Sequence, residues 1–205
     1  MVEEIINDLS VISPLLPIVV GVKKYKTLLW LYALAGLLFD ITMLISDKNR
    51  NIPVNIDVIA NTFLLIEFFL ISTYFKGKIL SNKIVFYVLF VFCFSIFVAL
   101  LAIRSPLVLN NYGAAFFNLV YIGYSIAGFY FILKRQEVLF LGRSEFFWFC
   151  AAILLYFTGN FLIFLSDAYF QQTNAVLQMR VWVFHNILNI MFSIMIAVAL
   201  LAKNE

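Results

Sequence analysis

Long apolar runs separated by short polar segments dominate this chain. Six of the runs cover residues 27–46, 56–75, 84–103, 112–133, 146–168 and 180–202. Each is about as long as the ~20 apolar residues that carry a helix across ~30 Å of hydrocarbon. The pattern therefore predicts six transmembrane helices, joined by short loops and with no soluble domain attached.

A seventh apolar run, residues 5–22, is interrupted by polar side chains and by Pro14 and Pro17. Two alternatives stay open: a kinked helix that crosses the membrane, or a short amphipathic segment lying in the interface. Crossing is favoured, because residues 15–22 are apolar on all faces and end at a basic cluster. We therefore expect an all-α bundle of seven spans, forming a single transmembrane domain over residues 1–205.

Composition agrees with a membrane as the solvent of this chain. Hydrophobic residues make up 64% of the sequence and charged residues 12%, whereas a soluble domain has about 25% charged residues. The net charge of +3 does not indicate nucleic-acid binding, because the basic residues fall in short clusters between apolar runs. Cys93 and Cys150 lie inside predicted spans, where packing is the expected role of a cysteine.

The basic residues of the loops predict the orientation of the bundle. With seven spans, four basic residues lie on one side, and the other ten lie on the side that the positive-inside rule makes cytoplasmic. This predicts an outer N-terminus, a cytoplasmic C-terminus and a location in the inner membrane of a bacterial cell. The ten are Lys23, Lys24, Lys26, Lys76, Lys78, Lys83, Lys134, Arg135, Arg143 and Lys203.

Two segments resemble each other and suggest an internal repeat. Residues 38–47 and 158–167 place Asp40 and Asn160, respectively, six residues before a Ser-Asp pair. A weaker similarity relates Asp57-x3-Asn61 to His185-x3-Asn189, since both pairs have the same spacing. Spans one to three and five to seven would then be parallel copies joined by span four, a 3+1+3 plan found in small transporters. The alternative is chance, since apolar helices draw on few residue types.

Polar residues inside the predicted spans indicate where a functional site would lie. Such residues are costly in hydrocarbon, so they normally face a cavity or a partner. Five of them, on five different spans, sit five to eight residues from the outer end, roughly 8–12 Å below it at 1.5 Å per residue. They are Asp40, Asn61, Asn118, Asn160 and His185. A shared, outward-facing polar pocket would accommodate all five.

Helical spacing adds further candidates on the same faces. Tyr121 lies three residues after Asn118, and Asn189 lies four residues after His185, so each pair shares a stripe of its helix. Asn186 is about 100° from the His185 stripe, and Glu67 lies near mid-membrane, about 120° around its helix from Asn61. For the asparagines, hydrogen bonding between helices is the alternative role. The predicted ligand-binding set is Asp40, Asn61, Glu67, Asn118, Tyr121, Asn160, His185, Asn186 and Asn189.

Several chemistries are excluded by the residues present. The single histidine excludes a multi-histidine zinc site, and no nucleophile elbow, metalloprotease helix or phosphate-binding glycine loop occurs. The last span has no lysine before Lys203, which excludes a retinal Schiff base there. We therefore expect no metal and no cofactor.

Four features of the chain are also found in a known group of proteins: Ile66-Glu67-Phe68, Gly159-Asn160, Asn186-x2-Asn189 and the ending that follows Lys203. With these features the chain resembles uncharacterised seven-helix bacterial membrane proteins. The resemblance spans most of the chain and implies no known activity.

The leading functional hypothesis is a receptor-like or sensor subunit that binds a small molecule or a lipid headgroup in the outer pocket. Without an output domain, it would signal through a partner protein or a homo-oligomer. The alternative is a small-solute transporter built on the 3+1+3 repeat. A third hypothesis is an intramembrane enzyme using Asp40, Glu67 and His185, although three titratable groups are a weak signature for catalysis.

Overall fold

The computed structural model describes residues 2–24, 27–48, 55–79, 83–104, 107–135, 141–173 and 175–202. Helices make up nearly all of these residues. They are α1 (Val2–Ile12), α2 (Leu15–Val20), α3 (Leu28–Lys48), α4 (Ile56–Lys78), α5 (Lys83–Arg104), α6 (Asn111–Arg135), α7 (Glu145–Thr173) and α8 (Ala175–Leu201), with single 3-10 turns η1 (Val22–Lys24) and η2 (Leu141–Arg143).

Each of the six clear apolar runs forms one helix, α3 to α8, as predicted. All six are long and apolar enough to cross a membrane, which supports a multi-pass membrane protein. Their outer surfaces agree, because large apolar side chains such as Ile84, Leu133 and Leu162 are exposed, as lipid-facing residues would be. Lys26, Arg50 and Lys203, which the loop-charge argument includes, lie outside the described residues.

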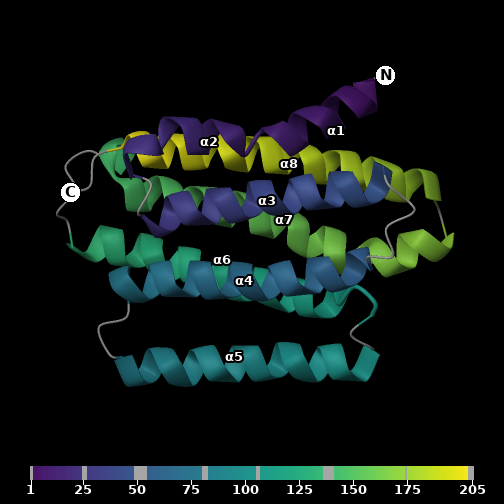
Figure 1. The fold of residues 1–205 in the computed structure, drawn as a ribbon. Coiled ribbons are helices and arrows are strands. Elements are labelled where there is room, and N and C mark those ends of the chain that lie inside the picture. The colour runs from purple at the N-terminus through teal and green to yellow at the C-terminus, as the bar shows by residue number, and fades with distance from the viewer. Residues whose placement is uncertain are drawn as a thin grey trace.

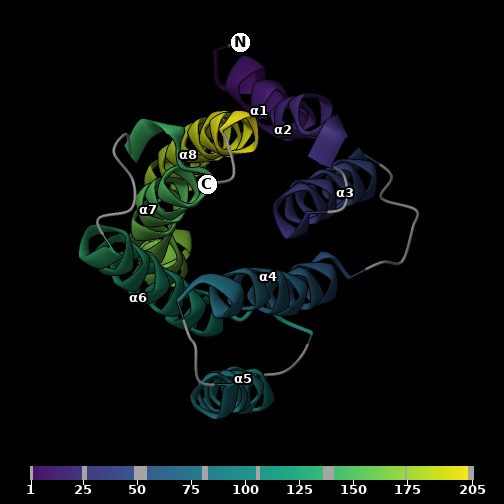
Figure 2. The same ribbon diagram turned by 90° about the vertical axis from the view of Figure 1, so that its left-hand side faces the viewer.

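The six long helices run side by side along one common axis (Figure 1). Viewed along that axis, the order around the bundle is α1–α2, α8, α7, α6, α4 and α3 (Figure 2). Helix α5 lies outside this ring, beside α4 and α6. It is held there by stacked rings, since Phe68 of α4 stacks on Phe90 of α5 at 4.9 Å, and Phe117 of α6 stacks on Phe97 of α5 at 4.5 Å.

The first predicted span, residues 5–22, is not one helix but two, with α1 and α2 of 11 and 6 residues. Neither is long enough to cross a bilayer alone, and the seven-span count rests on taking them together. The break occurs at Pro14, which has no N–H to donate to the Ser10 carbonyl. That carbonyl instead accepts hydrogen bonds from Ser13 Oγ at 2.8 Å and from Asn189 Nδ2 at 3.4 Å.

The pair α1–α2 follows α8 in parallel over much of its length. Asn186 Nδ2 donates to Asn7 Oδ1 at 3.2 Å, and the hydroxyls of Ser13 and Ser193 are 3.0 Å apart. Further along, Gly21 packs so closely that an added Cβ would lie 2.8 Å from Leu200 Cδ1. From Asn186 to Leu200 the rise along α8 is about 21 Å, so these contacts extend over about half of this 27-residue helix.

Polar side chains tie several helices together at the end where α2 leads into α3, the predicted cytoplasmic end. Lys24 Nζ donates to Glu145 Oε2 at 3.0 Å and to the Ala202 carbonyl at 2.9 Å. Tyr74 Oη donates to the other carboxylate oxygen of Glu145 at 3.2 Å. Because these residues come from η1, α4, α7 and the end of α8, the contacts fix four elements together.

Candidate functional site

A cavity of about 460 Å³ lies between α1–α2, α3, α4, α7 and α8. Its walls reach from the middle of these helices toward the predicted outer end, where α3 is followed by α4 and α7 by α8. Most of the lining is apolar or aromatic, with a minority of polar groups. A volume of this size and such a lining are typical of sites for small organic ligands.

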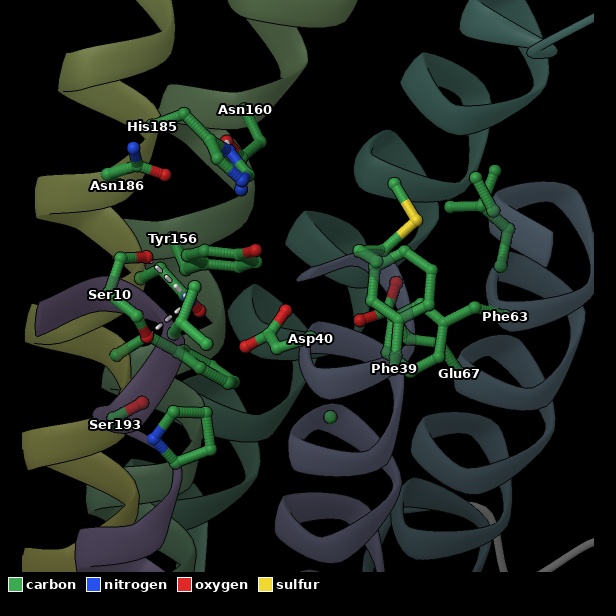
Figure 3. A pocket seen from close by; sticks show the side chains of 18 of the residues that line it. Ser10, Phe39, Asp40, Phe63, Glu67, Tyr156, Asn160, His185, Asn186 and Ser193 are labelled. Carbon is green, nitrogen blue, oxygen red and sulfur yellow. Dashed lines mark hydrogen bonds between the residues drawn. The ribbon is translucent and has the colours of Figure 1, made fainter. Parts of the chain in front are cut away.

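Asp40 projects from α3 into this cavity. Figure 3 shows its carboxyl group reaching toward α8, with Ser10 and Tyr156 on the opposite side. Ala33 and Gly36 lie on the same face of α3 and also line the cavity, as their spacing predicts. The space in front of Asp40 is left by Gly36, because nothing lies within 4 Å of the position where a Cβ would be.

Glu67 enters the same cavity from α4, at its inner part. The side chain is only 6% exposed, and Tyr32 Oη of α3 donates a hydrogen bond to Oε1 at 2.9 Å. In the described part of the chain, no cationic side chain faces Glu67 in the cavity. Helical spacing alone does not fix what Glu67 faces: a neighbouring helix, a second subunit or a deeper extension of the pocket are all compatible with it. In the structure, Glu67 lines the deeper part of the cavity.

Helices α7 and α8 contribute a polar wall near the predicted outer end. His185 Nδ1 lies 2.7 Å from Asn160 Oδ1, and since an amide oxygen only accepts, the imidazole nitrogen donates this bond. Asn189 Nδ2 donates to Ser10 Oγ at 3.0 Å. These side chains and Asn186 all line the cavity, so the predicted polar stripe of α8 faces it.

Asn61 lies elsewhere, although it is at the same predicted depth as Asp40. Its Nδ2 donates to the Val108 carbonyl at 2.9 Å, and its Oδ1 accepts from the Asn110 N–H at 3.0 Å. These two bonds attach α4 to the segment that precedes α6. Asn61 is not among the cavity-lining residues; its neighbours Ala60 and Phe63 are.

Asn118 and Tyr121 share one face of α6, as predicted, and that face packs against α7. With its amide oriented to satisfy both partners, Asn118 donates to the Ala114 carbonyl and accepts from the Phe161 N–H, each at 3.2 Å. Asn118 also touches the cavity. Tyr121 is fully buried, with its ring 4.5 Å from that of Phe157, and it does not line the cavity.

Several residues that line the cavity were not predicted from the sequence. Tyr32 and Tyr156 look like ordinary interfacial or core aromatics in a sequence with 10 tyrosines, and Ser10 stands in the ambiguous first run. The signal that could have identified Tyr32 is its place on the Asp40 side of α3, eight residues and therefore about two turns earlier. A similar signal exists for Tyr156, which lies four residues before Asn160 and therefore on the same stripe of α7.

Two observations bear on the chemistry that these residues could support. His185 bonds to an amide rather than to a carboxyl, so the contacts seen here do not form the base-and-orienter pair that activates a nucleophile. Within the described ranges, no group of three or more metal-ligating side chains is close enough to hold an ion. What remains is an aromatic hollow with two carboxyl groups and an amide–imidazole wall.

Comparisons with known proteins give no independent identification of the site. No protein-family model, curated protein or solved structure matches this chain.

Proposed function

We propose that this protein is a receptor-like membrane subunit that binds a small molecule, or the headgroup of a lipid, in the cavity between α3, α4 and α8. The observation that carries the proposal is the cavity itself, which brings Asp40, Glu67 and the polar stripe of α8 together. A carboxyl group inside a membrane helix is costly, and binding a ligand is a reason to keep one there.

The proposal includes a direction of access. The positive-inside rule places Lys23, Lys24, Lys76 and Lys78 in the cytoplasm, so the cavity would be reached from outside. The contacts among Lys24, Glu145 and Tyr74 support a closed cytoplasmic end. In this arrangement α1–α2 forms the seventh crossing, supported by its parallel path along α8, and the signal passes to a partner protein or a second copy.

A specific observation favours a second candidate, a small-solute transporter. Helix α5 lies outside the ring formed by the other elements (Figure 2). The order around the ring is such that a half-turn would exchange α1–α2, α3 and α4 with α6, α7 and α8, as the parallel 3+1+3 plan requires. The similarity is incomplete, because Asn189 lines the cavity whereas its proposed counterpart Asn61 does not.

The test of ligand binding is a thermal-unfolding screen of the purified full chain in detergent against a library of small molecules and lipid headgroups. Wild type is compared with Gly36→Leu, which adds a side chain to the cavity wall beside Asp40, and with Gly123→Leu, whose Cβ position is also unobstructed but which lies outside the cavity. Compounds that stabilise wild type and Gly123→Leu, but not Gly36→Leu, bind in the cavity. A Gly36→Leu protein that responds like wild type to every compound contradicts the proposal.

Transport and sensing are separated by a second measurement on the same compounds. Proteoliposomes containing the protein are loaded with buffer, and uptake of a radiolabelled ligand identified by the screen is followed. A receptor-like subunit binds without accumulation, so the internal label stays at the level of empty liposomes. Uptake that is saturable and abolished by Gly36→Leu favours the transporter.

A further inference from the structure

The charges around the cavity are unbalanced. Asp40 and Glu67 both line it, whereas no lysine or arginine is found among its described lining residues. Both residues belong to the lining of this one cavity (Figure 3), so their carboxyl groups border one shared space. Any anion that enters this space meets two carboxyl groups and no cationic partner.

Among the residues that the structure describes, few hydrogen-bond donors reach these two carboxyl groups. Glu67 is more than nine-tenths buried, and Tyr32 donates to one of its oxygens only. Asn189 lines the same cavity as Asp40, and its Nδ2 donates to Ser10 Oγ at 3.0 Å and to the Ser10 carbonyl at 3.4 Å. A buried carboxylate with few donors and no counter-charge is unfavourable, so a cation delivered by a ligand would supply the charge that the described cavity lining lacks.

The remaining wall is rich in aromatic rings. Tyr156 and Phe192 pack with their ring centroids 4.6 Å apart, and Tyr32 meets Phe192 edge-on at 5.8 Å. On the outer side, Trp182 meets His185 at 5.1 Å. Aromatic faces attract organic cations, and quaternary ammonium groups are recognised in proteins by aromatic cages of this composition.

We infer that the ligand of this cavity is an organic ammonium cation, with its charge held by Asp40 and Glu67 and its apolar part against Tyr32, Tyr156, Phe192 and Trp182. This inference rests on the proposed binding function and specifies its ligand class. An inorganic ion fits less well, because Ca²⁺, for example, requires six to eight oxygen ligands, and a volume of about 460 Å³ exceeds the needs of an ion.

The test uses choline and its uncharged carbon isostere 3,3-dimethyl-1-butanol, which differ in the charge of one central atom. The purified full chain is placed in phosphatidylglycerol nanodiscs, and thermal unfolding is followed as each compound is titrated. Choline is expected to raise the unfolding temperature of wild type at concentrations at least tenfold lower than those needed for 3,3-dimethyl-1-butanol. Equal effects of the two compounds, or no effect of choline, overturn the inference.

Two carboxyl-to-amide substitutions locate the charge. Asp40→Asn is expected to weaken the choline response at least tenfold, whereas Asp8→Asn, the same change at an exposed residue of α1 outside the cavity, leaves it intact. Glu67→Gln tests the choline response again at the inner part of the cavity. This variant also serves as the test if Asp40→Asn does not fold. An undiminished choline response in both cavity variants overturns the inference.

The source of the ammonium group is decided by the lipid. If the ligand is a choline headgroup, phosphatidylcholine nanodiscs occupy the cavity, and added choline has no further effect there. If the ligand is a free solute, the choline response is the same in phosphatidylcholine and phosphatidylglycerol; both results support the ammonium cation. A different outcome would separate the two proposals: choline has no effect, but an uncharged library compound stabilises wild type and not Gly36→Leu. That outcome contradicts the ammonium inference and still supports the proposed binding function.

Discussion

Where α6 packs against α7, polar and small side chains of the shared face meet partners on the neighbouring helix. Ser125 Oγ donates to the Cys150 carbonyl at 2.6 Å, and Gly128 leaves room for the Cys150 side chain, whose Sγ would lie 2.5 Å from an added Cβ. Across the bundle, where α3 faces α8, Gly36 leaves open space instead. Two glycines on membrane helices therefore serve opposite purposes, close packing in one region and an unfilled cavity in the other.

Two aspartates show the same contrast. Asp167 of α7 is buried and accepts hydrogen bonds from Asn111 at 3.2 Å, Gln178 at 3.1 Å and Trp182 at 3.2 Å, so that it joins α6, α7 and α8. Asp40 has no comparable set of donors in the described part of the chain. A carboxyl group in a membrane bundle can therefore be structural when several hydrogen-bond donors surround it. Without such donors it is a candidate for ligand binding.

The largest expected effect comes from filling the packed region. Gly128→Leu would drive a side chain into Cys150 and Phe146, and because overpacking of a close-packed interior costs about 1–3 kcal/mol or more, we expect loss of folded protein or a strong fall in unfolding temperature. Gly123→Leu on the same helix, with nothing within 4 Å of its Cβ position, should remain wild-type-like. A Gly128→Leu protein as stable as Gly123→Leu would contradict the packing described for α6 and α7.

Removing the carboxyl group of Asp167, which accepts three hydrogen bonds, should cause the next largest loss of stability. Asp167→Ala leaves the donors of Asn111, Gln178 and Trp182 without their acceptor. Only Asn111 among them is buried, so we take the low end of the range for an unsatisfied group, about 1 kcal/mol each, and expect a loss of about 3 kcal/mol. Equilibrium unfolding of the full chain, or its unfolding temperature in detergent, measures this. An unchanged stability would mean that these three bonds do not hold α6, α7 and α8 together.

Replacing Asp40, the carboxyl group with few donors, should change the stability in the opposite direction. In the absence of ligand, Asp40→Asn removes a charge that lacks a counter-charge, and we expect stability to stay equal or to rise by up to about 1 kcal/mol. Measured beside Asp167→Asn, which is expected to lose stability, the pair gives changes of opposite sign. A destabilised Asp40→Asn protein would show that Asp40 is a structural residue and end the contrast.

The smallest expected effect belongs to the open glycine. No atom lies within 4 Å of a Cβ added at Gly36, and leucine replaces the poorest helix former short of proline, so a gain of about 0.5 kcal/mol is expected. Its stability should therefore match that of Gly123→Leu, while cavity binding is lost. A strong fall in unfolding temperature for Gly36→Leu alone would indicate that the cavity closes in the folded protein.

The apolar pattern alone determined the membrane-compatible helices α3 to α8 and their limits to within a few residues. Each limit depends on the sum of local preferences over about 20 residues, so no knowledge of neighbours is needed. The same reasoning could not resolve residues 5–22. Pro14 divides them into two helices, and whether such a break is tolerated depends in part on a distant group, here Asn189, which donates to the Ser10 carbonyl beside the local bond from Ser13.

The roles of the polar residues were decided by tertiary structure. Spacing places Asn118 and Tyr121 on one face of α6, and depth places Asn61 level with Asp40, but neither shows which element lies opposite. The opposite element is α7 for Asn118 and the segment before α6 for Asn61, whereas Asp40 faces the cavity. A sequence specifies which groups must be satisfied in hydrocarbon; only the packed helices specify whether a neighbour satisfies them or a space is left for a ligand.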